Sequence, residues 1–182
     1  MPVHVTLRVR TGIPSLRRRR LVQALRKTFA AACDRGDFRL VHHSIQRNHL
    51  HLIVEAESHD ALSRGMRSLG TRIAHAVQRI FEVEGRILEG AYHAHVLRTP
   101  KEVRHALRYV LLNVRKHWRE FKGEAPPARM DECSSGRWFD GWKRQLPASR
   151  AGPCEVAPAA TWLLRIGWRS RGLIDPAAIP GS

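Results

Sequence analysis

Apolar and polar residues alternate near the start of the chain with the period of two that is typical of a β-strand. Val5, Leu7 and Val9 share one face of this segment, and Thr6 and Arg8 lie on the other. Three further segments are typical of strands, the last of them only partly alternating: residues 37–46, 48–56 and 86–97. We therefore expect four extended segments.

Between and after these strands, apolar residues recur at intervals of three and four, which predicts amphipathic helices. The first helix is expected to begin at Ser15, a candidate N-cap, and to bury a stripe that includes Leu21, Leu25 and Phe29. The second is expected to follow Ser58.

The third helix has the best-marked start. The sequence Thr99-Pro100-Lys101-Glu102 combines an N-cap threonine, a proline at the first helical position and a glutamate three residues after the cap. This helix should run from about Pro100 to about Glu120.

The order of these elements predicts the fold class. Strands that follow one another directly, with helices crossing over, favour an α+β fold: a ferredoxin-like sandwich with helices packed on a mainly antiparallel sheet. Residues 1–122 contain all of these elements. Residues 123–182 differ, because prolines interrupt any long element while tryptophans offer aromatic surface for docking. We expect a mostly irregular C-terminal extension with one short helix near residues 161–168.

Charge points to the class of partner. The 182-residue chain has 32 Lys and Arg residues against 16 Asp and Glu, a formal charge of +16. Arginine dominates, and its planar guanidinium pairs with phosphate and stacks on bases, so we expect nucleic acid rather than a membrane as partner. No apolar run is long enough to span a bilayer. The cysteines have no zinc-site spacing and suggest the reducing cytoplasm: Cys33, Cys133 and Cys154.

Two histidines lie in the strand expected over residues 48–56. Successive side chains of a strand point to opposite faces, so Leu50 and Leu52 share the apolar face while His49 and His51 stand together on the other. Two imidazoles on a rigid strand can bind one divalent cation when a third ligand comes from elsewhere in the fold. The alternative interpretation is that both are ordinary polar residues of a half-buried strand.

A second candidate group lies on the third helix. At about 100° per residue, its apolar residues gather in one sector that we expect to face the sheet: Val103, Leu107, Val110, Leu111, Val114 and Trp118. Tyr109 lies roughly opposite this sector, with His105 one turn before it and Asn113 one turn after it. Such a tyrosine has a free hydroxyl beside a carboxamide able to reach a metal. The alternative is an ordinary surface tyrosine.

Together, these two groups resemble those of the single-tyrosine HUH transposases, and in particular the REP-associated tyrosine transposases, which act on palindromic repeats. The resemblance rests on Asn48-His49-Leu50-His51 and on Arg108-Tyr109-Val110-Leu111-Leu112-Asn113-Val114-Arg115, which is similar to that group's Tyr-Ile-x-x-Asn-Pro-Val-Arg. It covers residues 1 to about 120 in the order and spacing of elements.

The resemblance implies that residues 1–122 are the catalytic domain, with His49 and His51 as metal ligands, Asn113 as the third ligand and Tyr109 as the nucleophile. The implied activity is that of a metal-dependent endonuclease and strand transferase, using Mg²⁺ or Mn²⁺. It would act on single-stranded or hairpin DNA through a 5′-phosphotyrosine intermediate.

Other residues have accessory or competing roles. His93-Ala94-His95 repeats the His-x-His spacing, so it is a second candidate metal pair or part of a DNA groove. His105 and His117 are candidate local bases for the tyrosine. His42 and His43 are adjacent, hence on opposite faces, and are not expected to share a metal. The arginines expected to contact the DNA backbone are Arg17, Arg18, Arg64, Arg67, Arg104, Arg108 and Arg115.

Two other functions remain open on the residues alone. One is a domesticated, non-catalytic protein that binds hairpin DNA with its arginines and does not use Tyr109. The other is a zinc-dependent hydrolase, for which no catalytic carboxylate lies at motif spacing. We expect a monomer or homodimer without a membrane partner, located in the cytoplasm and on the nucleoid when bound to DNA.

Overall fold

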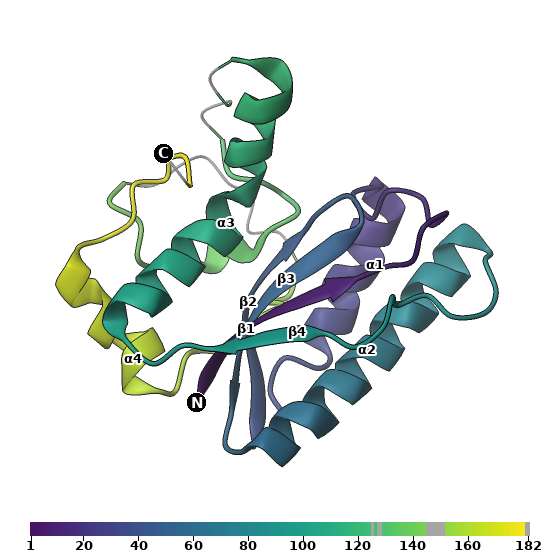
Figure 1. Ribbon diagram of the computed structural model, residues 1–182, viewed down its shortest axis with the longest axis horizontal. Coiled ribbons are helices and arrows are strands. Elements are labelled where there is room, and N and C mark those ends of the chain that lie inside the picture. Colours follow the sequence, from purple (N-terminus) through teal and green to yellow (C-terminus); the bar gives the residue numbers. More distant parts are fainter. Residues whose placement is uncertain (125, 127–128, 145–151, 181–182) are drawn as a thin grey trace.

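A single antiparallel sheet forms the centre of the computed structural model, which describes residues 1–124, 126, 129–144 and 152–180. Its strands are β1 (Pro2–Arg8), β2 (Phe38–Ile45), β3 (His49–Ala56) and β4 (His93–Val96), in the order β2-β3-β1-β4 (Figure 1). This architecture confirms the α+β fold that the element order predicted.

The fourth strand is shorter than expected. Only His93–Val96 pairs with β1, and the earlier part of the expected segment contributes one isolated bridge, between Val9 and Leu88. Gly85 and Gly90 both have positive φ, at 78° and 66°, which turns the chain away from an extended path.

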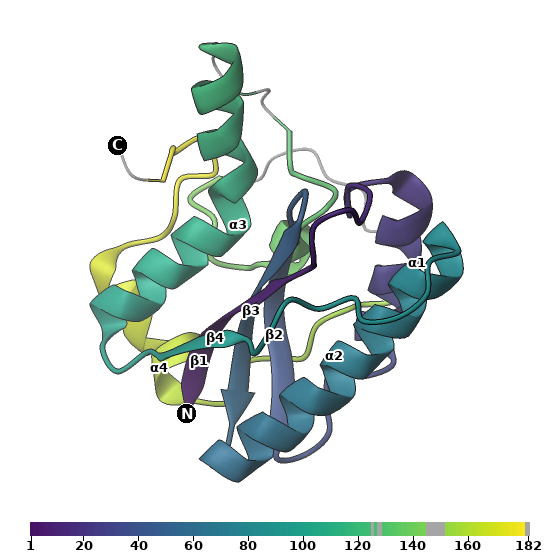
Figure 2. The same cartoon turned by 45° about the vertical axis from the view of Figure 1, so that its right-hand side comes forward.

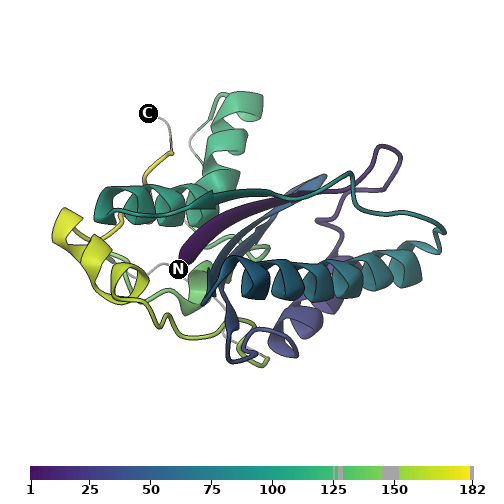
Figure 3. The ribbon, with the colours of Figure 1, turned by 60° about the horizontal axis from the view of Figure 1, so that its bottom comes forward.

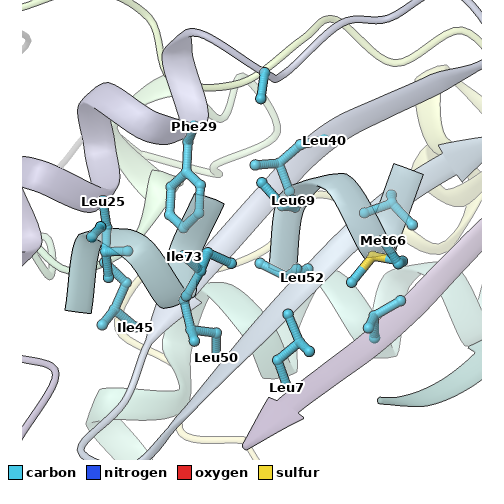
Figure 4. Close-up of a cluster of buried hydrophobic side chains, with 14 of the residues drawn as sticks. Leu7, Leu25, Phe29, Leu40, Ile45, Leu50, Leu52, Met66, Leu69 and Ile73 are labelled. Carbon is cyan, nitrogen blue, oxygen red and sulfur yellow. The ribbon is translucent and has the colours of Figure 1, made fainter. Parts of the chain in front are cut away.

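Two helices, α1 (Arg19–Ala30) and α2 (His59–Phe81), cover one face of the sheet (Figure 2). Their apolar stripes meet the inward side chains of the strands in a fully buried core that Figure 4 shows, with Phe29 from α1, and Leu69 and Ile73 from α2. Ser58 is the N-cap of α2, as expected, because its side chain accepts a hydrogen bond from Ala61 N–H.

The expected start of the first helix at Ser15 is wrong. The chain makes a turn there, and α1 begins four residues later with Arg18 at the N-cap position and no side-chain cap. Ser15 instead accepts a weak hydrogen bond, of 3.4 Å, from the Arg17 backbone N–H.

The third helix, α3 (Pro100–Lys122), lies on the opposite face of the sheet (Figure 3). Its start is the expected capping box, in which Thr99 and Glu102 each satisfy the other's backbone N–H. The apolar sector of α3 does not face the sheet alone. It also packs against the C-terminal extension, whose aromatic residues fill a second core: Phe139, Trp142 and Trp168.

The described part of the extension folds across α3 and contains three short helical segments, η1 (Ser135–Trp138), α4 (Trp162–Arg165) and η2 (Gly167–Arg171). Two buried carboxylates attach it to the sheet. Glu55 on β3 accepts hydrogen bonds from the backbone N–H groups of Ala160 and Thr161.

Within the described part of the chain, none of the helices has the length and apolar character that a membrane span requires.

The second carboxylate, Glu155, lies in the extension. It accepts hydrogen bonds of 2.6 Å from Arg137 and 2.8 Å from Trp138, and its other oxygen is 3.5 Å from the buried His43 of β2. A carboxylate that is 1% exposed needs such partners, so the extension is an integral layer of the molecule and covers the face that carries α3.

Candidate active site

The histidine pair of β3 faces α3. His49 and His51 lie on the same face of the strand, with their Nε2 atoms 3.0 Å apart and their rings in a T-shaped arrangement. His51 is buried, whereas His49 is half-buried and its Nδ1 lies 2.9 Å from Asn48 Oδ1. The structure thus brings the two imidazoles together on one face, as the strand period predicted.

Tyr109 lies against His51 of this pair. Its ring centroid is 5.0 Å from that of His51, in an edge-to-face contact, and the tyrosine is half-buried. The expectation that Tyr109 is turned away from the sheet is therefore wrong. The apolar sector of α3 packs against both the sheet and the extension. The neighbouring side of the helix, which carries Tyr109, therefore also lies against the sheet.

Two residues of β1 that sequence reasoning missed complete the surroundings of His51. Thr6 Oγ1 is 3.2 Å, and His4 Nε2 is 3.3 Å, from His51 Nδ1. The His4 ring also meets the Tyr109 ring edge-on at 5.8 Å. The alternation of β1 places His4 and Thr6 on its polar face, but only the pairing of β1 with β3 brings them to His51.

Further along α3, Asn113 follows Tyr109 by one helical turn. Its side chain is 1% exposed, and both Oδ1 and Nδ2 have no hydrogen-bond partner among the described residues. A buried carboxamide without partners carries a desolvation cost, so it indicates a site for an ion, a water or a ligand. His105, one turn before Tyr109, is exposed.

The histidines of the site are held in their neutral form. The pKa of His51 falls from 6.5 to about 3, mainly through burial and then through the neighbouring histidines. Burial also lowers the pKa of His4 to about 4 and, with Arg8 and His117, lowers the pKa of His49. A neutral imidazole is the form that binds a metal ion or accepts a proton.

Comparison of the sequence with models of protein families assigns the chain to a family. Residues 1–110 match the model of the family described as "Transposase IS200 like". The chain belongs to the IS200-like transposase family. Among curated protein sequences, none matches it significantly.

One solved structure supports this fold. A REP-associated tyrosine transposase bound to a REP hairpin superposes with a TM-score of 0.52 at 23% identity, over 64% of this chain and 67% of the other. A putative transposase from Deinococcus radiodurans gives a TM-score of 0.46 at 12% identity, over 57% and 84%.

In this IS200-like transposase, the competing pair His93 and His95 lies on the edge strand β4. Both are exposed; in the register of the sheet, His93 lies opposite Thr6 and His95 opposite His4. Strand β1 lies between β4 and β3 in the sheet and separates this pair from the β3 pair. Within the described residues, no group of three His, Cys, Asp or Glu side chains is placed to hold a metal ion.

Several arginines expected on DNA have internal partners in the transposase. Arg17 makes a two-pronged ion pair with Asp131, and Arg64 pairs with Asp37. Arg104 and Arg108 donate to backbone carbonyls of the C-terminal extension. Arg115 is buried, whereas Arg18 and Arg67 are exposed. Their contact with DNA stays a prediction.

Proposed function

We propose that this chain is a metal-dependent single-strand DNA endonuclease and strand transferase, acting on hairpin or palindromic DNA. The observation that carries the proposal is the contact between Tyr109 and His51, whose Nε2 lies 3.0 Å from that of His49. A nucleophile on α3 and two metal-binding side chains on β3 thereby face one another across one site.

The residues present fit a divalent cation. Two nitrogens bound to one ion at adjacent octahedral positions, each about 2.1 Å from it, are about 3.0 Å apart. The Nε2 atoms of His49 and His51 have this separation, 3.0 Å. The unpartnered Oδ1 of Asn113 supplies the oxygen donor that a third position requires. These residues would hold Mg²⁺ or Mn²⁺, which withdraws charge from the scissile phosphate when bound.

Tyr109 carries out the bond exchange. Its Oη attacks the phosphorus of a phosphodiester, the bond to the 3′ oxygen breaks, and a 5′-phosphotyrosine and a free 3′-OH result. The phenolic proton has to leave, since an ordinary tyrosine has a pKa of about 10. His117 is a candidate to accept it, because it lies near enough to lower the pKa of both His49 and His51.

The energy of the broken bond is retained in the phosphotyrosine. The released 3′-OH, or another 3′-OH, can attack it and rejoin the strands without a nucleotide cofactor. The similar solved structure holds a REP hairpin, and the charge of +16 suits a phosphate backbone, which supports hairpin DNA as the substrate.

A zinc hydrolase is less well supported by the geometry. Glu55 lies on the same face of β3 as the histidine pair, but its carboxylate accepts three hydrogen bonds from Ala160 and Thr161 and is 3% exposed. It is therefore not available as a general base.

The test is a cleavage assay with labelled hairpin DNA that has a single-stranded flank, in Mg²⁺ or Mn²⁺. The native chain should form a covalent adduct that resists SDS and is removed by protease. Tyr109→Phe should lose the adduct and keep DNA affinity, whereas Tyr92→Phe, which changes the other tyrosine, should retain it.

The metal ligands are tested in the same assay. His49→Ala and His51→Ala should abolish cleavage, and His93→Ala should reduce it less. Adduct formation by Tyr109→Phe would move the nucleophile elsewhere. Binding without any adduct in the native chain would favour the non-catalytic hairpin-binding protein.

A further inference from the structure

A basic groove lies between α1 and α2. These two helices cover the face of the sheet opposite α3, the helix that carries Tyr109 (Figure 3). The groove has a volume of about 560 Å³, and four cationic side chains line it: Arg20 and Lys27 from α1, and Arg72 and Arg79 from α2. Among the described residues that line it, none is Asp or Glu, and none is Phe, Trp or Tyr. The groove is thus positively charged along both walls.

None of these four cations is used within the protein. All four side chains are exposed. None of these side chains makes a hydrogen bond or an ion pair with any residue that the structure describes. Neighbouring cations on the same helices differ, because Arg26 pairs with Glu155 and Arg64 pairs with Asp37. The lining cations therefore remain available to an external anion.

The positions of the four cations destabilise the folded protein when no anion is bound. Helix α1 contains no acidic residue and α2 contains only Asp60, so like charges face one another across the groove. Arg20 lies in the first turn of α1, where the helix dipole disfavours a cation, and the N-cap residue Arg18 makes no side-chain cap. An anion in the groove would offset both effects.

We propose that this groove binds the phosphate backbone of the paired stem of the hairpin substrate; the identity of the DNA rests on the proposed function. Sites for single strands combine cations with aromatic residues on which bases stack, and this groove has no such residues. On each helix the two lining cations are seven residues apart, about 10 Å along the axis. That length spans about three phosphates of one duplex strand.

The groove and the catalytic site then have separate tasks. Contacts from arginine and lysine to phosphate position a duplex without reading its sequence. The stem lies against α1 and α2, and the single-stranded flank continues around the sheet to Tyr109 on the other face. The groove accordingly sets affinity and register, while the site beneath α3 carries the chemistry.

The experiment compares two full-length double variants with the same loss of charge. Arg72→Gln/Arg79→Gln removes two lining cations, and the control Arg165→Gln/Arg171→Gln removes two exposed arginines of the extension that have no described side-chain partner. Fluorescence anisotropy gives the affinity for a flanked hairpin, for its blunt stem and for the single-stranded flank alone, at several salt concentrations. Thermal unfolding checks that both variants fold.

The groove variant should bind the hairpin and the blunt stem about tenfold more weakly at low salt. Its slope of log K against log salt should fall by about 1.8, or about 0.9 for each lost duplex contact. Binding to the single-stranded flank should be unchanged, and the control variant should stay within about twofold of the native chain. Single-turnover cleavage at saturating hairpin should be unchanged in the control variant.

Three results would overturn the proposal: unchanged stem affinity in the groove variant, an equal loss in the control, or an equal loss on the single-stranded flank. Failure of the proposed function would appear differently, as the absence of a Tyr109 adduct in every protein at saturating DNA. The binding measurements remain interpretable in that case.

Discussion

The hydroxyl of Thr6 should tune cation binding at His51 without touching the cation. When His51 binds a metal through Nε2, its proton must sit on Nδ1, and that N–H then donates to Thr6 Oγ1 at 3.2 Å or to His4 Nε2 at 3.3 Å. Thr6→Val keeps the branched shape on β1 and removes only the hydroxyl. The substitution therefore tests orientation of His51 rather than packing.

The size of the effect follows from the two contacts. A hydrogen bond contributes about 1 kcal/mol net, which corresponds to about fivefold in a binding constant. Thr6→Val alone leaves His4 as a partner, so we expect Mn²⁺ affinity to fall by less than about fivefold. Thr6→Val/His4→Phe keeps a ring against Tyr109 but leaves Nδ1 without a partner, and should weaken binding about 10- to 100-fold.

Mn²⁺ titration of the DNA-free protein, followed by electron paramagnetic resonance, measures this affinity independently of cleavage. The matched control is Thr71→Val, the same chemical change on the exposed surface of α2, where the hydroxyl donates to Arg67 C=O. The control should bind Mn²⁺ like the native chain.

Unchanged affinity in the double variant would refute the reasoning, because His51 would then be oriented by packing alone. An equal loss in Thr71→Val would also refute it, since the effect would be global. Far-ultraviolet circular dichroism and the melting temperature establish that each variant keeps its fold.

Three further outcomes are expected. The pKa of both His42 and His51 falls from 6.5 to about 3, mainly through burial, so between these pH values the unfolded chain binds protons that the folded chain does not. The metal-free protein should therefore lose up to about 4 kcal/mol of unfolding free energy between pH 7 and pH 5, and equal urea midpoints would contradict this. Asn113→Leu removes an unpartnered buried carboxamide and should raise stability by about 1–2 kcal/mol while weakening Mn²⁺ binding; a lower melting temperature would show that the amide has a partner. Glu155→Gln removes the buried negative charge that pairs with Arg137 and should cost about 3 kcal/mol in urea unfolding, whereas Asp34→Asn, in an exposed ion pair, should cost less than about 0.5 kcal/mol; similar costs would contradict the role of Glu155.

Local patterns predicted the elements well where backbone geometry alone decides them. The period of two placed His49 and His51 on one face of β3, and the capping box at Thr99 marked the start of α3. The predicted start of α1 is wrong. Ser15 resembles an N-cap, but the chain makes a turn there and the helix begins at Arg19. A serine that can cap a helix can make the same kind of hydrogen bond, from its side chain to a nearby backbone N–H, in a turn. The residue type therefore does not distinguish a helix start from a turn.

The sequence by itself determined which residues share a face of each element, because the strand and helix periods are properties of the local backbone. It thereby identified the histidine pair, and the row on α3 that carries Tyr109 and Asn113. Only the tertiary structure decided that β1 pairs with β3, which brings His4 and Thr6 to His51. It also decided that the extension covers the apolar sector of α3 and that Arg17 is held by Asp131. These outcomes depend on contacts between distant segments, and such contacts are set by how all the layers pack at once rather than by any local pattern.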